Sequence, residues 1–316
     1  MSPRAVAVIP AYLRTPRDAA WLVRGVQALA RQAPVVSAVV VADDGGPERP
    51  PPMPGSVEVV RAGRNGGPAA ARNRGIERAL ALGAWAVLFT DHDCVCDPGW
   101  AAALVEALRG GAVAASGVTC SLGRTWLDRY QDFAGALNGR WALPGHEALI
   151  YGPSCNLAVR AEVLGKVRFD ERFPTAAGED FDFCHRLRRL GVIAFVPQAV
   201  MRHDFGYAST LGGLPSFLRQ VRRYGAADRL LWEKHPELRA LASEACAAAD
   251  VSAEHPPVQP SAYRRAALSQ VRPRRFVPFF FLVKHLARRE YRRGQRAPER
   301  WRIPSAALPP GTLGAS

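Results

Sequence analysis

The sequence contains no apolar run that approaches the roughly 18 residues of a membrane-spanning helix. Its longest aromatic and apolar run, Phe276–Val283, has eight residues and contains Pro278. The chain also enters its first strand-like run, Ala5–Ile9, without the charged and apolar regions of a signal peptide. These absences predict a cytoplasmic protein, with a peripheral contact at the membrane left open.

Paired zinc-binding cysteines are also lacking. The six cysteines are scattered, and Cys94 and Cys96 are too close together for the C-x₂-C arrangement of a zinc knuckle. The thiols are therefore expected to be reduced, as is usual inside the cell. The proportions of hydrophobic residues, 48%, and of charged residues, 22%, are those of a folded globular protein, so neither a disordered nor a fibrous chain is expected.

Most of the chain carries little net charge, although the net charge of the whole chain is +14. Residues 261–302 contain 13 arginines or lysines against Glu290 and Glu299, a net of +11, which leaves about +3 for everything else. We therefore divide the chain into a main domain at residues 1–235, a helical, arginine-rich extension at 236–303, and a tail at 304–316 that is expected to be disordered.

Strand-like and helix-like runs alternate in the first 110 residues. The pattern predicts a doubly wound, mostly parallel α/β sheet, in which ligands bind beyond the carboxyl ends of the strands. Asp97 is expected to cap a helix whose first residue is Pro98. Strands are predicted at Val6–Ile9, Val35–Val41, Val57–Arg61, Trp85–Thr90, Val113–Val118 and Ile193–Val196, and helices at Asp18–Gln32, Ala69–Leu82, Pro98–Gly110 and Glu179–Leu190.

Two aspartates follow the fourth predicted strand, with one residue between them. In an extended backbone the side chains of Asp91 and Asp93 point the same way, so both carboxylates can reach one point beyond the strand. Oxygen ligands of this kind suit Mg²⁺ or Mn²⁺, with substrate phosphates completing the shell. A solvated loop at the end of a strand is the alternative interpretation.

Two further segments have the composition of a nucleotide site. Asp43 and Asp44 end a buried strand at a glycine turn, where carboxylates can accept hydrogen bonds from a base and a ribose. A glycine turn also opens the helix that contains Arg72, so its amides and this guanidinium can face a diphosphate. An ordinary Asp–Gly turn and a capped helix with a solvated arginine are the alternatives.

Acid–base chemistry is indicated by residues from the second half of the domain. Glu179 and Asp180 begin a predicted helix, where they either stabilise its dipole or provide a general base, Asp180, for an acceptor hydroxyl. His203 follows a predicted strand and is a candidate third metal ligand or a structural histidine. Arginines in the stretch 219–225 can clamp a diphosphate, with Tyr224 as a stacking face, or simply form a solvated helix face.

Taken in order, these motifs resemble the family 2 glycosyltransferases of GT-A fold. The resemblance covers about Val6 to Gly225 and implies an inverting, metal-dependent, hexosyltransferase-like enzyme with Mn²⁺ or Mg²⁺ and a nucleoside diphosphate sugar. The GT-A fold is a Rossmann-like, mostly parallel sheet flanked by helices. The matching segments are V-I-P-A-Y (8–12), V-A-D-D-G (41–45), N-G-G-P-A-A-A-R-N (65–73), T-D-H-D (90–93), G-P-S-C-N-L-A-V-R (152–160), F-D-E-R-F (169–173) and G-E-D-F-D-F-C-H-R-L (178–187).

The resemblance also implies roles for single residues. Asp44 is expected to contact the nucleobase, Asp91 the ribose or the metal, and Asp93 the metal. Gln220, Arg223 and Tyr224 resemble a Q-x-x-R-W motif that has tyrosine in place of tryptophan. The predicted catalytic residues are Asp180 and Glu179; the metal ligands are Asp91, Asp93 and His203; the substrate-binding residues are Pro10, Tyr12, Asp43, Asp44, Arg72, Asn73, Asp91, Asn156, Gln220, Arg223 and Tyr224.

Three other functions compete with this interpretation. A sugar-nucleotide nucleotidyltransferase would need a loop rich in glycine and basic residues after its first strand, but residues 10–14 contain one arginine and no glycine. A glycosidase would use paired carboxylates without nucleotide-like turns. A binding or scaffold protein could place its basic extension, residues 261–302, on an anionic membrane or a nucleic acid, although no nucleic-acid recognition motif accompanies it.

Overall fold

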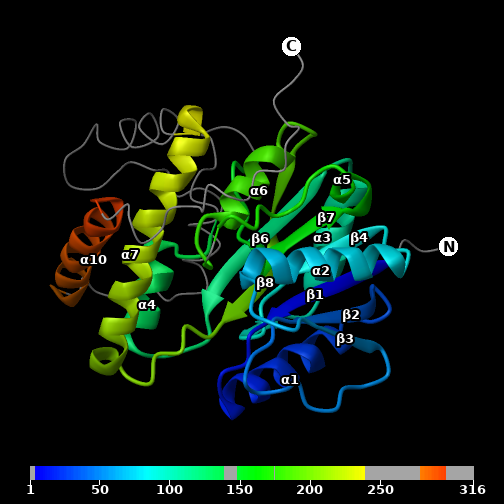
Figure 1. Ribbon diagram of the computed structural model, residues 1–316, viewed down its shortest axis with the longest axis horizontal. Helices are drawn as coiled ribbons and strands as arrows, with labels where there is room; N and C mark the ends of the chain where they lie inside the picture. Colours follow the sequence, from blue (N-terminus) through cyan, green and yellow to red (C-terminus); the bar gives the residue numbers. More distant parts are fainter. Residues whose placement is uncertain (1–3, 139–147, 174, 239–277, 297–316) are drawn as a thin grey trace.

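The computed structural model describes residues 4–138, 148–173, 175–238 and 278–296. Within these ranges the chain forms one eight-stranded sheet flanked by helices, in the order β3-β2-β1-β4-β7-β6-β8-β5 (Figure 1). The strands are β1 (Ala5–Ala11), β2 (Val36–Asp43), β3 (Val57–Arg61), β4 (Ala86–Phe89), β5 (Cys94–Cys96), β6 (Ala114–Ser121), β7 (Leu157–Arg160) and β8 (Ile193–His203).

The direction of the strands decides which segments meet at one edge of the sheet. Strands β1, β2, β3 and β4 are mutually parallel, whereas β7 lies antiparallel to both β4 and β6. Strand β8 is parallel to β6. The carboxyl ends of β1, β2, β4, β6 and β8 therefore share an edge with the beginning of β7, and we call this the carboxyl edge.

Helices cover both faces of the sheet. Capping boxes fix two of their starting points: Thr15 with Asp18 at α1, and Thr125 with Asp128 at α4. The helices are α1 (Pro16–Ala30), α2 (Gly67–Ala81), α3 (Trp100–Arg109), α4 (Trp126–Ala134), α5 (Ala161–Leu164), α6 (Glu179–Leu187), α7 (Thr210–Lys234) and α10 (Pro278–Arg296), with a 3₁₀ turn, η1, at Ser154–Asn156. No helix of the described residues combines the length and the apolar character that a membrane span requires.

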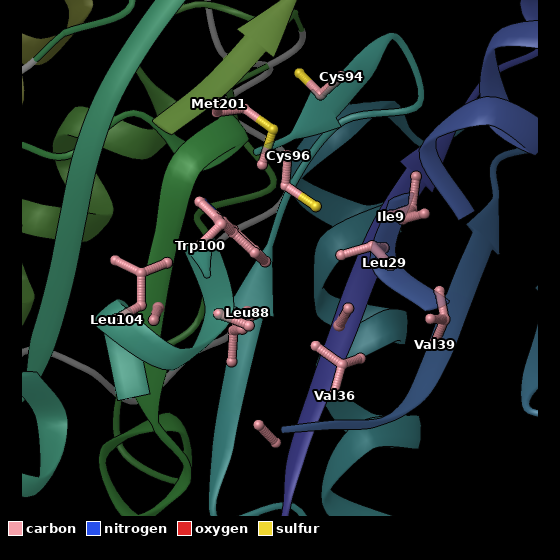
Figure 2. Packing of buried hydrophobic residues seen from close by; sticks show 14 of the residues in the cluster. Ile9, Leu29, Val36, Val39, Leu88, Cys94, Cys96, Trp100, Leu104 and Met201 are labelled. Carbon is pink, nitrogen blue, oxygen red and sulfur yellow. The ribbon is translucent and has the colours of Figure 1, made fainter. Parts of the chain in front are cut away.

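Two hydrophobic clusters sandwich the sheet. Figure 2 shows the first, in which Leu29 of α1 and Trp100 and Leu104 of α3 pack on strand residues such as Ile9 and Leu88. The second, on the other face, includes Ile76, Val159, Leu187 and a set of three aromatic rings.

Three aromatic rings join the segments nearest the carboxyl edge. The rings of Phe169 and Phe183 stack with centroids 4.0 Å apart, and Phe89 meets Phe169 edge-on at 5.5 Å. Phe89 ends β4, Phe183 belongs to α6, and Phe169 lies in the segment between α5 and α6. Aromatic packing of this kind fixes α6 against the end of β4.

The arginine-rich helix α10 lies directly along α7 (Figure 1). Two glycines permit the contact, because a Cβ atom at Gly225 would lie 2.1 Å from the Tyr291 carbonyl oxygen and one at Gly294 would lie 2.0 Å from that of Arg222. Val283 is fully buried against Phe217 and its neighbours. The division into a domain at 1–235 and an extension at 236–303 stays a prediction, and the predicted tail at 304–316 lies outside the described residues.

The expected mixed α/β, mostly parallel architecture is confirmed. The predicted start of the third helix is wrong: Asp97 and Pro98 do not open it. Gly99, with a φ of 80°, precedes α3, which begins at Trp100. The Asp97 carboxylate instead accepts two hydrogen bonds of 2.7 Å from Arg202 at the end of β8. The Asp97 side chain therefore pairs with a distant strand and does not cap the helix.

Candidate active site

Arg72, on the second turn of α2, joins two acidic segments at the carboxyl edge. Its Nη2 donates to Asp91 Oδ1 and its Nη1 to Glu179 Oε1, both at 2.9 Å. Its guanidinium lies 5.5 Å from the centre of the Phe169 ring, and only 3% of its side chain is exposed. Although burial opposes the charge, Asp91 and Glu179 raise the pKa of Arg72, so it remains a fixed cation between the end of β4 and the start of α6.

Two carboxyl groups, Glu179 and Asp180, meet at the beginning of α6. Glu179 is 2% exposed, and its Oε2 has no hydrogen-bond partner. Burial, reinforced by the neighbouring Asp180 charge, raises the pKa of Glu179 to about 7 against the opposing effect of Arg72. Burial also raises the pKa of Asp180. Carboxyl groups with raised pKa values are suited to accept and release protons near neutral pH.

Hydrogen bonds hold the Asp180 carboxylate in one orientation. Its Oδ2 accepts from the Tyr151 hydroxyl at 3.0 Å and from the Ser154 amide at 3.3 Å. Its Oδ1 accepts from the Phe181 amide at 2.9 Å. The ring of Tyr151 stacks on that of Phe181, with centroids 5.1 Å apart. Asp180 is therefore positioned by residues just before β7 as well as by its own helix.

A group of potential metal ligands lies at the end of β8. His203 Nε2 is 3.5 Å from Asp93 Oδ1, and Cys94 Sγ is 3.9 Å from the same oxygen. The three ligand atoms of these residues lie within 4.8 Å of one another. Burial, together with Cys155, raises the pKa of the Cys94 thiol well above its ordinary value, so Asp93 and His203 are the better ligands. Asp93 and His203, both predicted from the sequence as metal ligands, therefore lie close together in the fold.

The premise of an extended backbone through Asp91 and Asp93 is wrong. Strand β4 ends at Phe89, and the chain then turns, with the Cys94 amide donating to the Asp91 carbonyl at 3.1 Å. The turn directs Asp91 to Arg72 and Asp93 to His203. The two carboxylates consequently have different partners, and a shared metal ion stays a prediction.

Asp43 and Asp44, at the end of β2, are engaged within the protein. Asp43 is fully buried and forms an ion pair with Arg61, and it also accepts from the Gly45 amide at 3.1 Å. Asp44 accepts from Arg74 Nη2 at 2.5 Å and from the two amides that open α2, Gly66 at 3.0 Å and Gly67 at 2.8 Å. These contacts hold the glycine turns, and the predicted contacts to a nucleotide stay predictions.

The two candidate asparagines are also used internally. Asn73 exchanges hydrogen bonds of 2.9 Å with the backbone of Phe169. Asn156, in η1, accepts from Trp100 Nε1 at 2.8 Å and donates to the Val118 carbonyl at 3.0 Å. Both side chains therefore fix segments that line the carboxyl edge.

Helix α7 brings its polar motif to the start of α6. Gln220 Nε2 donates to the Ala176 carbonyl at 3.2 Å, and Arg223 Nη1 lies 3.4 Å from Gln220 Oε1. Arg223 is exposed and Tyr224 half-buried. Of the remaining candidates, Pro10 is buried in β1, and Tyr12, just beyond β1, is 38% exposed.

Sequence reasoning did not identify three residues that this site depends on. Tyr151 orients Asp180, while Arg61 and Arg74 neutralise the aspartates that follow β2. Tyr151 adjoins a quoted motif, which was the available signal. The two arginines carried no signal, because nothing in the sequence pairs them with carboxylates 18 and 30 residues away.

The sequence profile described as Glycosyl transferase family 2 matches residues 6–163, half of the chain. Two curated proteins, from two strains of Mycobacterium tuberculosis, are both described as pre-mycofactocin glycosyltransferase and are each 29% identical to the chain over 216 residues. These matches cover 63% of this chain and 43% of each relative, so the chain spans less than half the length of these curated relatives.

Among solved structures, the chain is similar to S. aureus TarS. The crystal structure of TarS 1–349 gives a TM-score of 0.48 at 16% identity, covering 95% of this chain and 92% of that crystallised chain. Its complex with UDP-GlcNAc gives 0.45 at 17% identity, covering 93% and 90%. Because both TM-scores lie below 0.5, the family assignment rests on the sequence profile.

Proposed function

The chain belongs to glycosyl transferase family 2, and we propose that it transfers a sugar from a nucleoside diphosphate donor to a hydroxyl group, with inversion at the anomeric carbon. The observation that carries this proposal is the arrangement around Arg72. One buried guanidinium connects Asp91, beside the Asp93–His203 pair, to Glu179, beside Asp180. Potential metal ligands and the proposed general base thus lie near one another at one edge of the sheet, which supports the proposal.

Asp180 is the proposed general base. A carboxylate with a raised pKa, held by Tyr151 and Ser154, can accept the proton of an acceptor hydroxyl as its oxygen attacks the sugar. Attack from the face opposite the departing diphosphate inverts the anomeric configuration. Glu179 and Arg72 supply a buried ion pair that fixes the start of α6 and thereby the position of Asp180.

Asp93 and His203 are the proposed ligands of Mn²⁺ or Mg²⁺, with Asp91 on the same turn. The fit is supported by the proximity of their ligand atoms and by His203 Nδ1, which is buried without a partner. When bound, such an ion would neutralise charge that develops on the departing diphosphate. Arg72 Nη1 and Nη2 are already bonded to Glu179 and Asp91, so we propose that Arg72 mainly orients this site.

Arg223 is the proposed protein cation for the diphosphate. It is exposed on α7, and the hydrogen bond of Gln220 to the Ala176 carbonyl brings that part of α7 to the loop before α6. A guanidinium can contact two phosphate oxygens at once. Tyr224, half-buried one residue further along, offers a ring on which the acceptor or donor can stack.

Release of nucleoside diphosphate tests the proposed reaction. UDP-, GDP- and dTDP-sugars would each be incubated with the full chain and Mn²⁺, with and without hydroxyl acceptors of lipid-linked, polysaccharide and peptide types. Acceptor-dependent release from donors of one base, together with a product of inverted configuration, is expected. Release of nucleoside monophosphate or of pyrophosphate would instead favour the nucleotidyltransferase alternative.

A peripheral membrane contact through α10 is a second, compatible proposal. Phe281 and Leu282 are 54% and 55% exposed at the start of α10, and a run of cations follows them on the same helix. Exposed apolar side chains next to arginines suit a surface of anionic lipid. Part of the predicted contact region, residues 261–277 and 297–302, lies outside the described residues.

Vesicle sedimentation tests the membrane contact. The chain should sediment with anionic vesicles more than with neutral ones, and added salt should weaken the binding. Phe281→Asp should reduce it, whereas Val192→Asp, at an equally exposed site just before β8, should not. Equal binding by both variants would rule out α10 as the contact.

A further inference from the structure

A second group of nitrogen and oxygen ligands lies at the other end of α6. It consists of His185, on the last turn of α6, with His235 and Glu237, which immediately follow α7. The ligand atoms of the three residues lie within 4.8 Å of one another. The two imidazoles are 8% and 7% exposed, and their ring centroids are 4.5 Å apart. None of these residues belongs to the candidate active site.

Asp182 determines which nitrogen of His235 carries the proton. This aspartate is fully buried, and its Oδ2 accepts from Arg186 Nε at 2.9 Å and Nη2 at 2.6 Å, while its Oδ1 lies 2.5 Å from Lys234 Nζ. Despite burial, these cations lower the pKa of Asp182. An ionised carboxylate only accepts hydrogen bonds, so His235 Nε2, 2.7 Å away, donates to it.

The other nitrogen of a neutral His235 therefore presents a lone pair. That atom, Nδ1, lies 3.7 Å from Glu237 Oε1. The same Glu237 oxygen is 2.9 Å from His185 Nε2, and His185 Nδ1 is buried without a partner. If His185 Nε2 carries a proton, it can donate it to Glu237 Oε1, and Nδ1 still lacks a partner.

We propose that His185, His235 and Glu237 bind a zinc ion. Two imidazole nitrogens and one carboxylate oxygen form a ligand set that zinc accepts, with a fourth position for water. Ligands of a tetrahedral zinc ion, each about 2.0–2.1 Å from the metal, are separated from one another by roughly 3.3 Å. The two measured separations, 2.9 and 3.7 Å, lie on either side of that value.

The surroundings of the site support this assignment. Metal-bound histidines usually donate their second ring N–H to a carboxylate, which is what His235 does towards Asp182. The Glu237 side chain is 50% exposed, so the open coordination position can face solvent. Nitrogen-rich coordination also separates this site from the Asp93–His203 site, whose proposed ions prefer oxygen.

A bound ion would join the last turn of α6 to the end of α7. The first residues of α6 include Asp180, and α7 contains Gln220 and Arg223. Zinc would therefore stabilise the relative placement of these two helices without touching substrate. Its main measurable effect should be on the melting temperature, because a ligand that binds only the native state stabilises it by mass action.

Zinc affinity measured on the full chain tests the proposal. The chelator-treated protein would compete for Zn²⁺ with a chromophoric chelator, and Co²⁺ would report tetrahedral coordination by its visible absorption. Glu237→Gln and His185→Gln should each weaken zinc binding at least tenfold and abolish the cobalt spectrum. His285→Gln, an exposed histidine on α10, should leave both unchanged.

Two results would overturn the proposal. One is a wild-type chain that neither binds Zn²⁺ more tightly than the competing chelator nor gains melting temperature with it. The other is equal affinity in Glu237→Gln and in His285→Gln. Should His185→Gln fail to fold, Glu237→Gln decides alone, because Glu237 is half exposed and its replacement leaves the packing of both imidazoles intact.

Discussion

Two adjacent pairs of acidic residues at the carboxyl edge differ in their surroundings. At the end of β2, Asp43 and Asp44 are neutralised by Arg61 and Arg74 and accept hydrogen bonds from backbone amides. At the start of α6, Glu179 retains an oxygen without a partner, and the pKa values of both carboxyl groups are raised. A neutralised carboxylate holds a loop in place, whereas a destabilised one is available for proton transfer.

The contrast suggests a structural role for Asp43 and Asp44 and a chemical role for the carboxyl groups at the start of α6. A buried carboxylate that is paired with an arginine loses stability when it is changed, since the buried cation is left unpaired. When the fold disfavours the ionised form of a carboxyl group, replacing that group should change turnover more than stability. Replacing single carboxylates of the two pairs by amides tests this difference directly.

The largest effect is expected from Asp180→Asn. Loss of a positioned general base typically costs about 10²–10⁴-fold in turnover. The amide keeps the size of the side chain, so binding of the donor nucleotide and the melting temperature should change little. Nucleoside diphosphate release and nucleotide-dependent melting would be measured on the same preparation. Near-normal turnover would remove Asp180 from the role of base.

Asp93→Asn should abolish the metal dependence of nucleotide binding. The substitution removes the carboxylate of the Asp93–His203 ligand pair. Mn²⁺ should therefore no longer increase the melting shift produced by a nucleoside diphosphate. His92→Gln, on the same turn but outside the ligand group, is the matched control and should behave as wild type. Equal metal dependence in all three proteins would contradict the site.

Asp44→Asn should affect stability more than chemistry. It weakens contacts to Arg74 and to the amides of Gly66 and Gly67, at a cost of roughly 1–3 kcal/mol in the free energy of unfolding. Denaturant unfolding and turnover per folded molecule are the measurements. If instead stability is unchanged and nucleotide binding is lost, Asp44 contacts the base as the motif predicts, and the contrast with Asp180 fails.

The last expected effect, on stability alone, comes from Glu179→Gln and depends on pH. The pKa of Glu179 is raised from 4.5 to about 7, so the folded state binds its proton more tightly than the unfolded state does. Wild-type stability should therefore fall relative to the variant as pH rises from about 4.5 to 7, by roughly 3 kcal/mol at most. Unfolding of both proteins at several pH values gives this difference, and a constant difference would show that the pKa is not raised.

Much of the architecture could be predicted from local sequence. Apolar, β-rich runs placed β3 at its observed bounds and β1, β2, β4 and β6 within three residues, whereas β5 and β7 were not predicted. The helix that was expected to begin at Pro98 shows the limit of local signals, because Asp97 pairs with Arg202, more than 100 residues away. A residue whose partner comes from a distant strand cannot be assigned from its neighbours in the chain.

The same limit applies to the candidate site. Asp93 and His203 were both predicted as metal ligands, but their proximity depends on the antiparallel pairing of β5 with β8, in which Cys94 lies opposite His203. The separation of Asp91 from Asp93 was not predicted, because it depends on a turn that closes on the Asp91 carbonyl. Arg72 was expected near a diphosphate, and its two carboxylate partners become visible only when α2, β4 and α6 are assembled.

Nucleotide protection is the most direct test of the central claim that the carboxyl edge binds a nucleoside diphosphate with a metal ion. The wild-type chain would be melted with UDP, GDP or dTDP, each in Mn²⁺ or in EDTA. We predict that one base raises the melting temperature, that EDTA removes most of the increase, and that Asp180→Asn retains it. No increase with any of the three nucleotides would contradict the account.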